Sequence, residues 1–263
     1  MKKLAITLAL LLCVTGVVFA EEKPKTGADP TDFITRYEPS YEHLRSDGGG
    51  HSDLFVMRGD LAIRRDLSVR LDVPMVYYNP PERIEPAGFE SSFGSGDLVS
   101  QIIWKPYSNK YIATALGARI DWPINSEDEL GRGGIMYAPV AGVAWFPVKG
   151  LAFIPFFQYN LAANLDNDPL PGDRDMNQLS VRPIVLWQPM HKYLSWLMAD
   201  PELIFDYDGT KTTTLDLGIE YGKMVTKTIA VFVKPTAGLT DGSKSWGVKV
   251  GFRHMFPSKV LFD

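Results

Sequence analysis

Residues 111–122 alternate between two kinds of side chain with a period of two. The even positions form an apolar stripe that ends at Trp122, whereas the odd positions are small or charged and include Arg119 and Asp121. Successive side chains of a β-strand point to opposite faces, so the pattern predicts a strand with one apolar and one polar face. The segment is long enough to cross a bilayer as a tilted strand. Because the pattern recurs along most of the chain, we expect a membrane-spanning β-sheet protein.

The first twenty residues have the features of a secretory signal. Lys2 and Lys3 form the positive start, an apolar core follows, and the cleavage site ends at Ala20. We therefore expect a signal peptide at 1–20, a flexible polar leader in the periplasm at 21–30, a folded body at 31–256 and a short tail at 257–263. No later apolar stretch has the length of a spanning helix, which excludes a helical membrane protein.

The composition of the mature chain excludes several classes of chemistry. Cys13 is the only cysteine and lies in the signal, which removes disulfides, thiolate metal sites and cysteine nucleophiles. Cleavage removes Lys2 and Lys3 from the 27 basic residues and none of the 31 acidic ones, so the net charge becomes about −6. No basic patch of the kind that binds nucleic acid is present, and we expect no nucleic-acid partner.

Twelve alternating segments are expected to be strands, and their connections alternate between short turns and longer loops, as in outer-membrane barrels. The first of them is required because a barrel with both ends on one side has an even number of strands. We predict an all-β fold, a transmembrane antiparallel up-and-down barrel of about 12 strands. The expected strands are 33–44, 53–63, 67–78, 95–105, 111–122, 135–146, 151–161, 178–188, 196–208, 213–222, 228–238 and 246–256.

Prolines interrupt several of these segments. A proline cannot donate a ladder hydrogen bond, so we expect bulges or local kinks where it lies inside a strand. The five positions are Pro139, Pro155, Pro183, Pro201 and Pro235.

Three segments carry a resemblance to a known family. They are residues 93–98 (Phe-Gly-Ser-Gly-Asp-Leu), residues 179–183 (Leu-Ser-Val-Arg-Pro) and the aromatic-terminated ending 246–257. Over about the last three quarters of its length, the chain resembles the outer-membrane barrel transporters typified by putative MetA-pathway phenol-degradation proteins. The resemblance implies a Gram-negative outer-membrane barrel that passes small, often hydrophobic compounds, with no catalytic residues to carry over. The final strand also resembles the signal that the barrel-assembly machinery looks for. The other expected partners are outer-membrane lipid and lipopolysaccharide.

Charged residues fall on the face opposite the apolar stripe. If that stripe faces lipid, they point into the lumen and are the candidate solute path. Such charges either line a pore with a transverse field or pair with one another and plug a narrow barrel, and the sequence leaves both open. The candidates are Arg119, Asp121, Arg182, Asp200, Glu202, Asp206, Asp216, Glu220, Lys234, Lys249 and Arg253.

Apolar residues also fall on the inward positions of three strands, at Ile154, Phe156, Ile184, Leu186 and Phe232. They either form an apolar sector suited to amphipathic or aromatic solutes, or the prolines bulge the strands and reverse the two faces. Large aromatic residues near strand ends predict girdles at the two membrane interfaces. These residues are Trp104, Trp122, Tyr137, Trp145, Tyr159, Trp187, Tyr207, Tyr221 and Trp246.

Two other patterns bear on function. Aspartates crowd 162–177, either as a weak cation site or as a solvated acidic loop, without the spacing of a dedicated calcium loop. His51 and Ser52 are adjacent and so point to opposite faces of a strand, and His43 has no serine near it in sequence. We therefore expect no enzyme and no cofactor. The alternatives to a transporter are a closed barrel with a structural or adhesive role and an outer-membrane lipid hydrolase.

Overall fold

The computed structural model describes residues 26–46, 49–80, 91–126, 130–131, 134–163, 177–189, 194–207, 212–240 and 245–256. The expected signal peptide, the tail 257–263 and most of the acidic loop 162–177 lie outside these ranges. Within the described ranges, no helix is long and apolar enough to cross a membrane.

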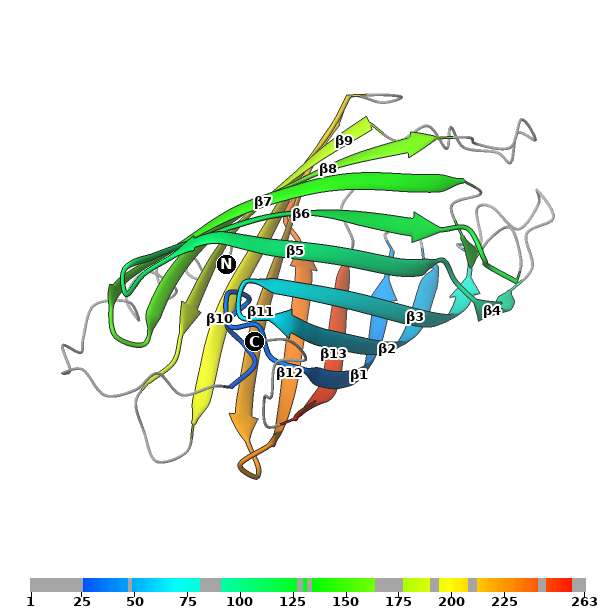
Figure 1. The fold of residues 1–263 in the computed structure, drawn as a ribbon. Coiled ribbons are helices and arrows are strands. Elements are labelled where there is room, and N and C mark those ends of the chain that lie inside the picture. Colours follow the sequence, from blue (N-terminus) through cyan, green and yellow to red (C-terminus); the bar gives the residue numbers. More distant parts are fainter. Residues whose placement is uncertain are drawn as a thin grey trace.

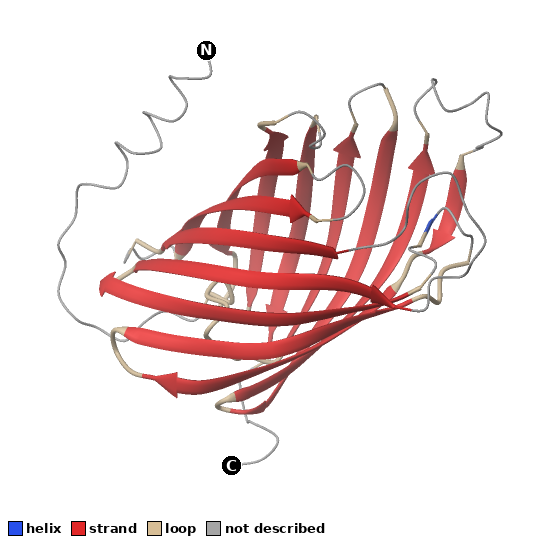
Figure 2. Cartoon of the chain, turned by 90° about the horizontal axis from the view of Figure 1, so that it is seen from above, coloured by secondary structure: helices blue, strands red, loops and turns tan. Residues whose placement is uncertain are grey.

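One antiparallel sheet contains all the strands, and twelve of them close into a barrel (Figures 1 and 2). Closure is made by β1, which pairs with both β2 and β13, while β2 pairs with β3. The short β4 pairs only with the end of β3 that β5 leaves uncovered. The strands are β1 Arg36–Arg45, β2 His51–Arg64, β3 Leu67–Asn79, β4 Ser92–Ser95, β5 Leu98–Ser108, β6 Ile112–Trp122, β7 Ile135–Val148, β8 Leu151–Ala163, β9 Asn177–Trp187, β10 Ser195–Asp206, β11 Thr213–Met224, β12 Ile229–Gly238 and β13 Trp246–Met255. The predicted barrel is confirmed, including its first strand, whose existence was inferred from parity.

The two faces of each strand follow the alternation in the sequence. In β6, Ile112, Leu116 and Trp122 are exposed on the outside, whereas Ala113 and Asp121 are buried on the inside. Eight of the nine expected girdle aromatics are exposed on the outer surface, and the ninth, Tyr159, is half-buried. An apolar exterior around a polar interior reverses the arrangement of a soluble protein and suits a barrel surrounded by lipid.

The prolines do not reverse the faces, and of the two expected outcomes, bulges or local kinks, the bulges are wrong at these five positions. Pro155 lies opposite Pro183 with no shift of register, and both point outward. Between β9 and β10 the pairing lapses around Pro183 and then resumes in the same register at Val181 and Leu203. A missing proline donor therefore removes local ladder bonds, while the flanking pairs hold the register. The three register shifts lie elsewhere, between Ala62 and Arg64, Trp104 and Tyr107, and Trp145 and Val148.

The two ends of the barrel differ. We call the end with the short connections 64–67, 108–112 and 148–151 the turn end, and the opposite one the loop end. The lysine-glycine turn between β7 and β8 uses the left-handed backbone of Gly150 (φ +80°). A Cβ atom at position 150 would also collide with the carbonyl oxygen of Gln188.

Residues 26–34 form a segment before β1 that folds into the turn end (Figure 1). Thr26, Ala28 and Asp29 are almost completely buried. Residues 26–30 belong to the stretch expected to be a flexible leader, and instead they are packed. The physical reason is that Ala28 and Ile34 join an apolar cluster inside the barrel. The polar composition of the leader gave no indication of this packing.

Candidate solute path

A buried arginine organises the inner surface. The guanidinium of Arg253 on β13 donates to Glu38 of β1 at 2.6 Å and forms an ion pair with Glu220 of β11 at 3.0 Å. Glu220 also accepts a 2.7 Å hydrogen bond from the indole of Trp196. The arginine lies 4.4 Å from the ring centroid of Phe232, so its charge is held by two carboxylates and an aromatic face.

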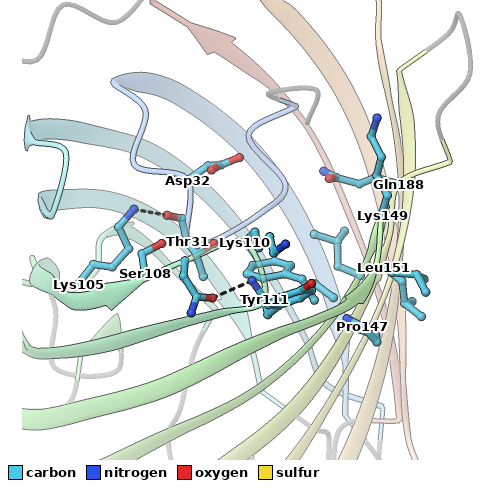
Figure 3. A pocket seen from close by; sticks show the side chains of 16 residues that line it. Thr31, Asp32, Lys105, Ser108, Lys110, Tyr111, Pro147, Lys149, Leu151 and Gln188 are labelled. Carbon is cyan, nitrogen blue, oxygen red and sulfur yellow. Dashed lines mark hydrogen bonds between the residues drawn. The ribbon is translucent and has the colours of Figure 1, made fainter. Parts of the chain in front are cut away.

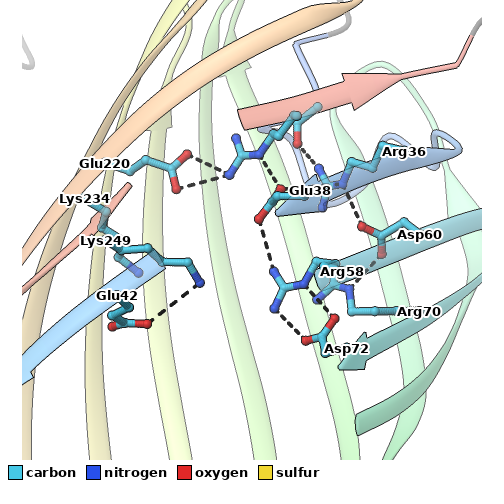
Figure 4. A network of polar contacts seen from close by, with 12 residues as sticks. Arg36, Glu38, Glu42, Arg58, Asp60, Arg70, Asp72, Glu220, Lys234 and Lys249 are labelled. Atoms are coloured by element: carbon cyan, nitrogen blue, oxygen red, sulfur yellow. Dashed lines mark hydrogen bonds and ion pairs between the residues drawn. The ribbon is translucent and has the colours of Figure 1, made fainter. Parts of the chain in front are cut away.

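The same network continues over β1, β2 and β3 (Figure 4). Asp60 accepts from Arg36 and from Arg70, each at 2.7 Å. Arg58 binds Asp72 through two nitrogens at 2.9 and 2.8 Å and approaches Glu38 at 3.5 Å. We call these residues the central network, and its four arginines face four carboxylates. Its members are Arg36, Glu38, Arg58, Asp60, Arg70, Asp72, Glu220 and Arg253.

A second ionic group lies on β9, β10 and β12. Asp200 accepts from Arg182 at 2.9 and 2.5 Å and from Lys234 at 2.5 Å. Ser180 donates to Glu202 at 2.8 Å. Lys234 reaches Asp200 by crossing β11 at Gly218, where an added Cβ would overlap the lysine side chain. Glycine is therefore needed there for the side chain to lie flat along the inner surface.

This crossing makes a stability prediction. Gly218→Val is expected to displace Lys234 from Asp200 and lower the free energy of unfolding by about 1–3 kcal/mol, because a buried carboxylate loses one of its partners. Urea unfolding in nanodiscs measures the change. Gly59→Val is the matched control, since no atom lies within 4 Å of the Cβ position at Gly59. Equal losses in both variants would contradict the proposed role of the crossing.

The predicted lumen residues are distributed as follows. Arg182, Asp200 and Lys234 come together, as do Glu220 and Arg253. Arg119 and Asp121 pair along β6 at 2.7 Å, and Lys249 lies 3.9 Å from Glu42. Asp206 and Asp216 are near the loop ends of β10 and β11. Their role in a solute path stays a prediction.

The sequence-based set missed six members of the central network: Arg36, Glu38, Arg58, Asp60, Arg70 and Asp72. The signal was available, because a basic and an acidic residue two positions apart recur on three consecutive strands. Each such pair falls on the face opposite the apolar stripe, so the alternation used for β6 would have found them.

The expected apolar sector exists and lies toward the turn end. Ile154, Ile184, Leu186 and Phe232 are buried within the barrel, and Phe156 packs against them. Trp196 belongs to the same cluster and was not anticipated. The inner surface therefore changes from charged at mid-barrel to apolar near the turn end.

The N-terminal segment occupies part of the turn-end opening. Gln188 donates to the hydroxyl of Thr26 at 2.5 Å, Arg36 donates to the carbonyl of Gly27, and Lys105 donates to the carbonyl of Thr31 at 3.0 Å. Against β1–β3 the segment leaves only a crevice of about 30 Å³. On the side of β5–β8 it leaves a cavity of about 540 Å³ (Figure 3). The segment therefore narrows the opening asymmetrically.

The histidines considered for catalysis lie on the outer face of β1 and β2. Asp53 accepts from Tyr41 at 2.7 Å and lies 2.7 Å from the Nδ1 atom of His43. His51 contacts the rings of His43 and Tyr77. Within the described ranges, neither histidine has a serine as a hydrogen-bond partner, so a base and its orienting carboxylate are present without a nucleophile. The described residues also contain no group of three or more acidic, histidine or cysteine side chains that could hold a metal ion.

Comparison with solved structures shows the fold. The chain is similar to the crystal structure of the COG4313 outer membrane channel from Pseudomonas putida F1, with a TM-score of 0.69 and 12% identity over 90% of this chain and 100% of that chain. It is also similar to the NanC porin (TM-score 0.59, 11% identity, 84% and 99% coverage). The KdgM porin in complex with disordered oligogalacturonate gives a TM-score of 0.53 at 12% identity, with 83% and 99% coverage. No protein-family model and no curated protein matches the chain.

Proposed function

We propose that this protein is an outer-membrane channel of a Gram-negative bacterium that passes small solutes. The observation that carries the proposal is a closed barrel with exposed apolar side chains outside and ion-paired side chains inside. The similarity to outer-membrane channels and porins supports the same conclusion at the level of the fold.

The competing interpretation is a barrel plugged by its own charges. The balanced central network favours it, because paired charges need no water. Against it, the side chains of Arg58, Arg119 and Arg182 remain 23%, 29% and 31% exposed although each is ion-paired inside the barrel. A filled interior would bury these guanidinium groups as completely as that of Arg253. Water that reaches the inner surface supports a path for solutes.

The orientation follows the habit of outer-membrane barrels. Short turns face the periplasm and longer loops face outward, so the turn end, with the segment 26–34 packed into it, is on the periplasmic side. The exterior contacts outer-membrane lipid and lipopolysaccharide, and assembly uses the barrel-assembly machinery. The resemblance to phenol-degradation barrels and the apolar sector near the turn end support small hydrophobic or aromatic compounds as solutes.

Osmotic swelling of proteoliposomes tests the channel directly. We expect liposomes that contain the protein to swell in the pentose arabinose and not in the tetrasaccharide stachyose, because the segment 26–34 fills part of the turn end and leaves beside it a cavity of only about 540 Å³. Heat-denatured protein in the same lipid is the control. Absence of swelling in arabinose would favour the plugged, structural barrel. Release of fatty acid from the liposome phospholipid would instead support the alternative function, an outer-membrane lipid hydrolase.

A further inference from the structure

Among the described residues, two lysines at the turn end form no ion pair with a carboxylate. The ammonium of Lys105 donates to the carbonyl of Thr31 at 3.0 Å and lies 4.9 Å from the ring centroid of Phe33. The ammonium of Lys110 lies 4.6 Å from the ring centroid of Tyr111. In the part of the chain that the structure describes, no carboxylate comes within ion-pair distance of either lysine, and Asp32 and Asp66 act on Lys105 only from beyond that distance. They differ in this from the central network, in which each arginine meets at least one acid.

Both lysines border the same cavity, which we call the mouth cavity (Figure 3). Its volume of about 540 Å³ falls within the range of small-ligand sites. Its lining includes the apolar side chains of Phe146, Ala152 and Leu186, and Lys149 also borders it. Asp32 is the one acidic residue among the described lining residues. The cavity thus combines an apolar floor with two lysines, Lys105 and Lys110, that form no ion pair among the described residues.

The rim beside Lys110 is held in place. The Oδ1 atom of Asn109 accepts hydrogen bonds from the backbone N–H groups of Tyr111 and Ile112, each at 2.8 Å. The amide nitrogen of Asn109 donates to the hydroxyl of Tyr107 at 2.7 Å. These bonds fix the turn between β5 and β6, so the backbone that carries Lys110 is positioned before a ligand arrives.

We propose that the mouth cavity binds small amphipathic monocarboxylates. The ring or short alkyl chain lies on the apolar floor, and the carboxylate lies between Lys105 and Lys110. An anion supplies the ion-pair partner that no described carboxylate gives these two lysines, and an apolar body distinguishes the ligand from inorganic anions. The inference rests on the proposed channel function and deepens it, because it assigns solute selection to the turn-end opening and leaves the self-neutralised central network as scaffold.

Binding of benzoate to the protein in nanodiscs tests the proposal by isothermal titration calorimetry, with empty nanodiscs to subtract partition into lipid. Benzamide has the same shape without the charge, and acetate has the charge without the ring. We expect benzoate to bind at least about tenfold more tightly than either. Lys105→Gln and Lys110→Gln are each expected to weaken benzoate binding about fivefold to tenfold. Lys227→Gln, in the turn between β11 and β12 at the same end, is the matched control and should leave binding unchanged.

Two results would overturn the proposal. Equal binding of benzamide would mean that the cavity recognises only apolar surface, and unchanged benzoate binding in both lysine variants would place any site elsewhere. Swelling in arabinose, measured on the same preparations, separates this failure from that of the channel. Swelling without lysine-dependent binding of benzoate would contradict the carboxylate site alone. Absence of swelling would contradict the channel function itself.

Discussion

Deletion of residues 21–30 is expected to raise the single-channel conductance by at least about twofold, because conductance is limited by the narrowest part of a pore. In the intact protein, Thr26, Ala28 and Asp29 are buried in the turn-end opening. Their removal joins the mouth cavity to the space they occupied. Planar-bilayer recordings of the intact and shortened proteins under the same salt and voltage measure the change.

A cross-link gives the complementary control. Thr26 and Gln188 are hydrogen-bonded through their side chains, and the one cysteine of the sequence, Cys13, lies within the segment expected to be a signal peptide. The Thr26→Cys/Gln188→Cys variant should therefore show a lower and steadier conductance when oxidised than after reduction. If deletion leaves conductance unchanged, the constriction lies elsewhere in the barrel.

Arg253→Met is expected to cost about 3–5 kcal/mol of the free energy of unfolding, the largest loss for any single ionic residue in the barrel. The substitution leaves Glu38 and Glu220 charged, and both are almost completely buried. Glu38 would keep only the 3.5 Å approach of Arg58 and the 3.9 Å approach of Arg36. Urea unfolding in nanodiscs, followed by tryptophan fluorescence, measures the loss.

Two variants show whether unpaired charge is the cause. Lys249→Met removes a cation that lies 3.9 Å from Glu42, with both side chains partly exposed, and should cost no more than about 1 kcal/mol. Arg253→Met combined with Glu38→Gln should recover part of the loss, because one stranded carboxylate becomes neutral. If Arg253→Met and Lys249→Met cost the same, water screens the central network and burial does not set its energy.

The closed barrel was predictable because two simple rules act on the sequence. Alternation assigns each residue of a strand to one of two faces, as Leu116 and Asp121 show in β6. A barrel with both chain ends on one side needs an even number of strands, so a strand was expected before the segment 53–63. The segment 33–44 was identified as that strand, and β1 does pair with both β2 and β13. Both rules depend only on local sequence and on the common location of the two chain ends.

Two ion pairs inside the barrel were less predictable because each of them joins strands that are not neighbours. Arg253 of β13 reaches Glu220 of β11, and Lys234 of β12 reaches Asp200 of β10. A side chain can contact the next strand but one only if the strand tilt brings the two residues level and the strand between them has a small residue at the crossing point. Gly222 similarly leaves room for the indole of Trp196, which is buried inside the barrel. Trp196 was not among the aromatic residues expected in the two girdles.

The packing of the N-terminal segment had no sequence signal of the same kind. The expected leader, 21–30, is mostly polar or charged and shows no alternation, so composition favoured a flexible segment. Their burial comes from long-range contacts, such as that of Thr26 with Gln188, 162 positions away. The mouth cavity depends on the same docking, and for that reason the sequence did not indicate it.

Cysteine modification during bilayer recording tests most directly whether the barrel holds an aqueous path. Tyr41 and Glu42 are neighbours on β1, with Tyr41 exposed on the outer face and Glu42 directed inward toward Lys249 (Figure 4). We predict that a charged, membrane-impermeant thiol reagent alters the current through the Glu42→Cys protein and leaves that through the Tyr41→Cys protein unchanged. No change in the current through the Glu42→Cys protein, or equal changes in the currents through the two variants, would contradict a water-filled lumen.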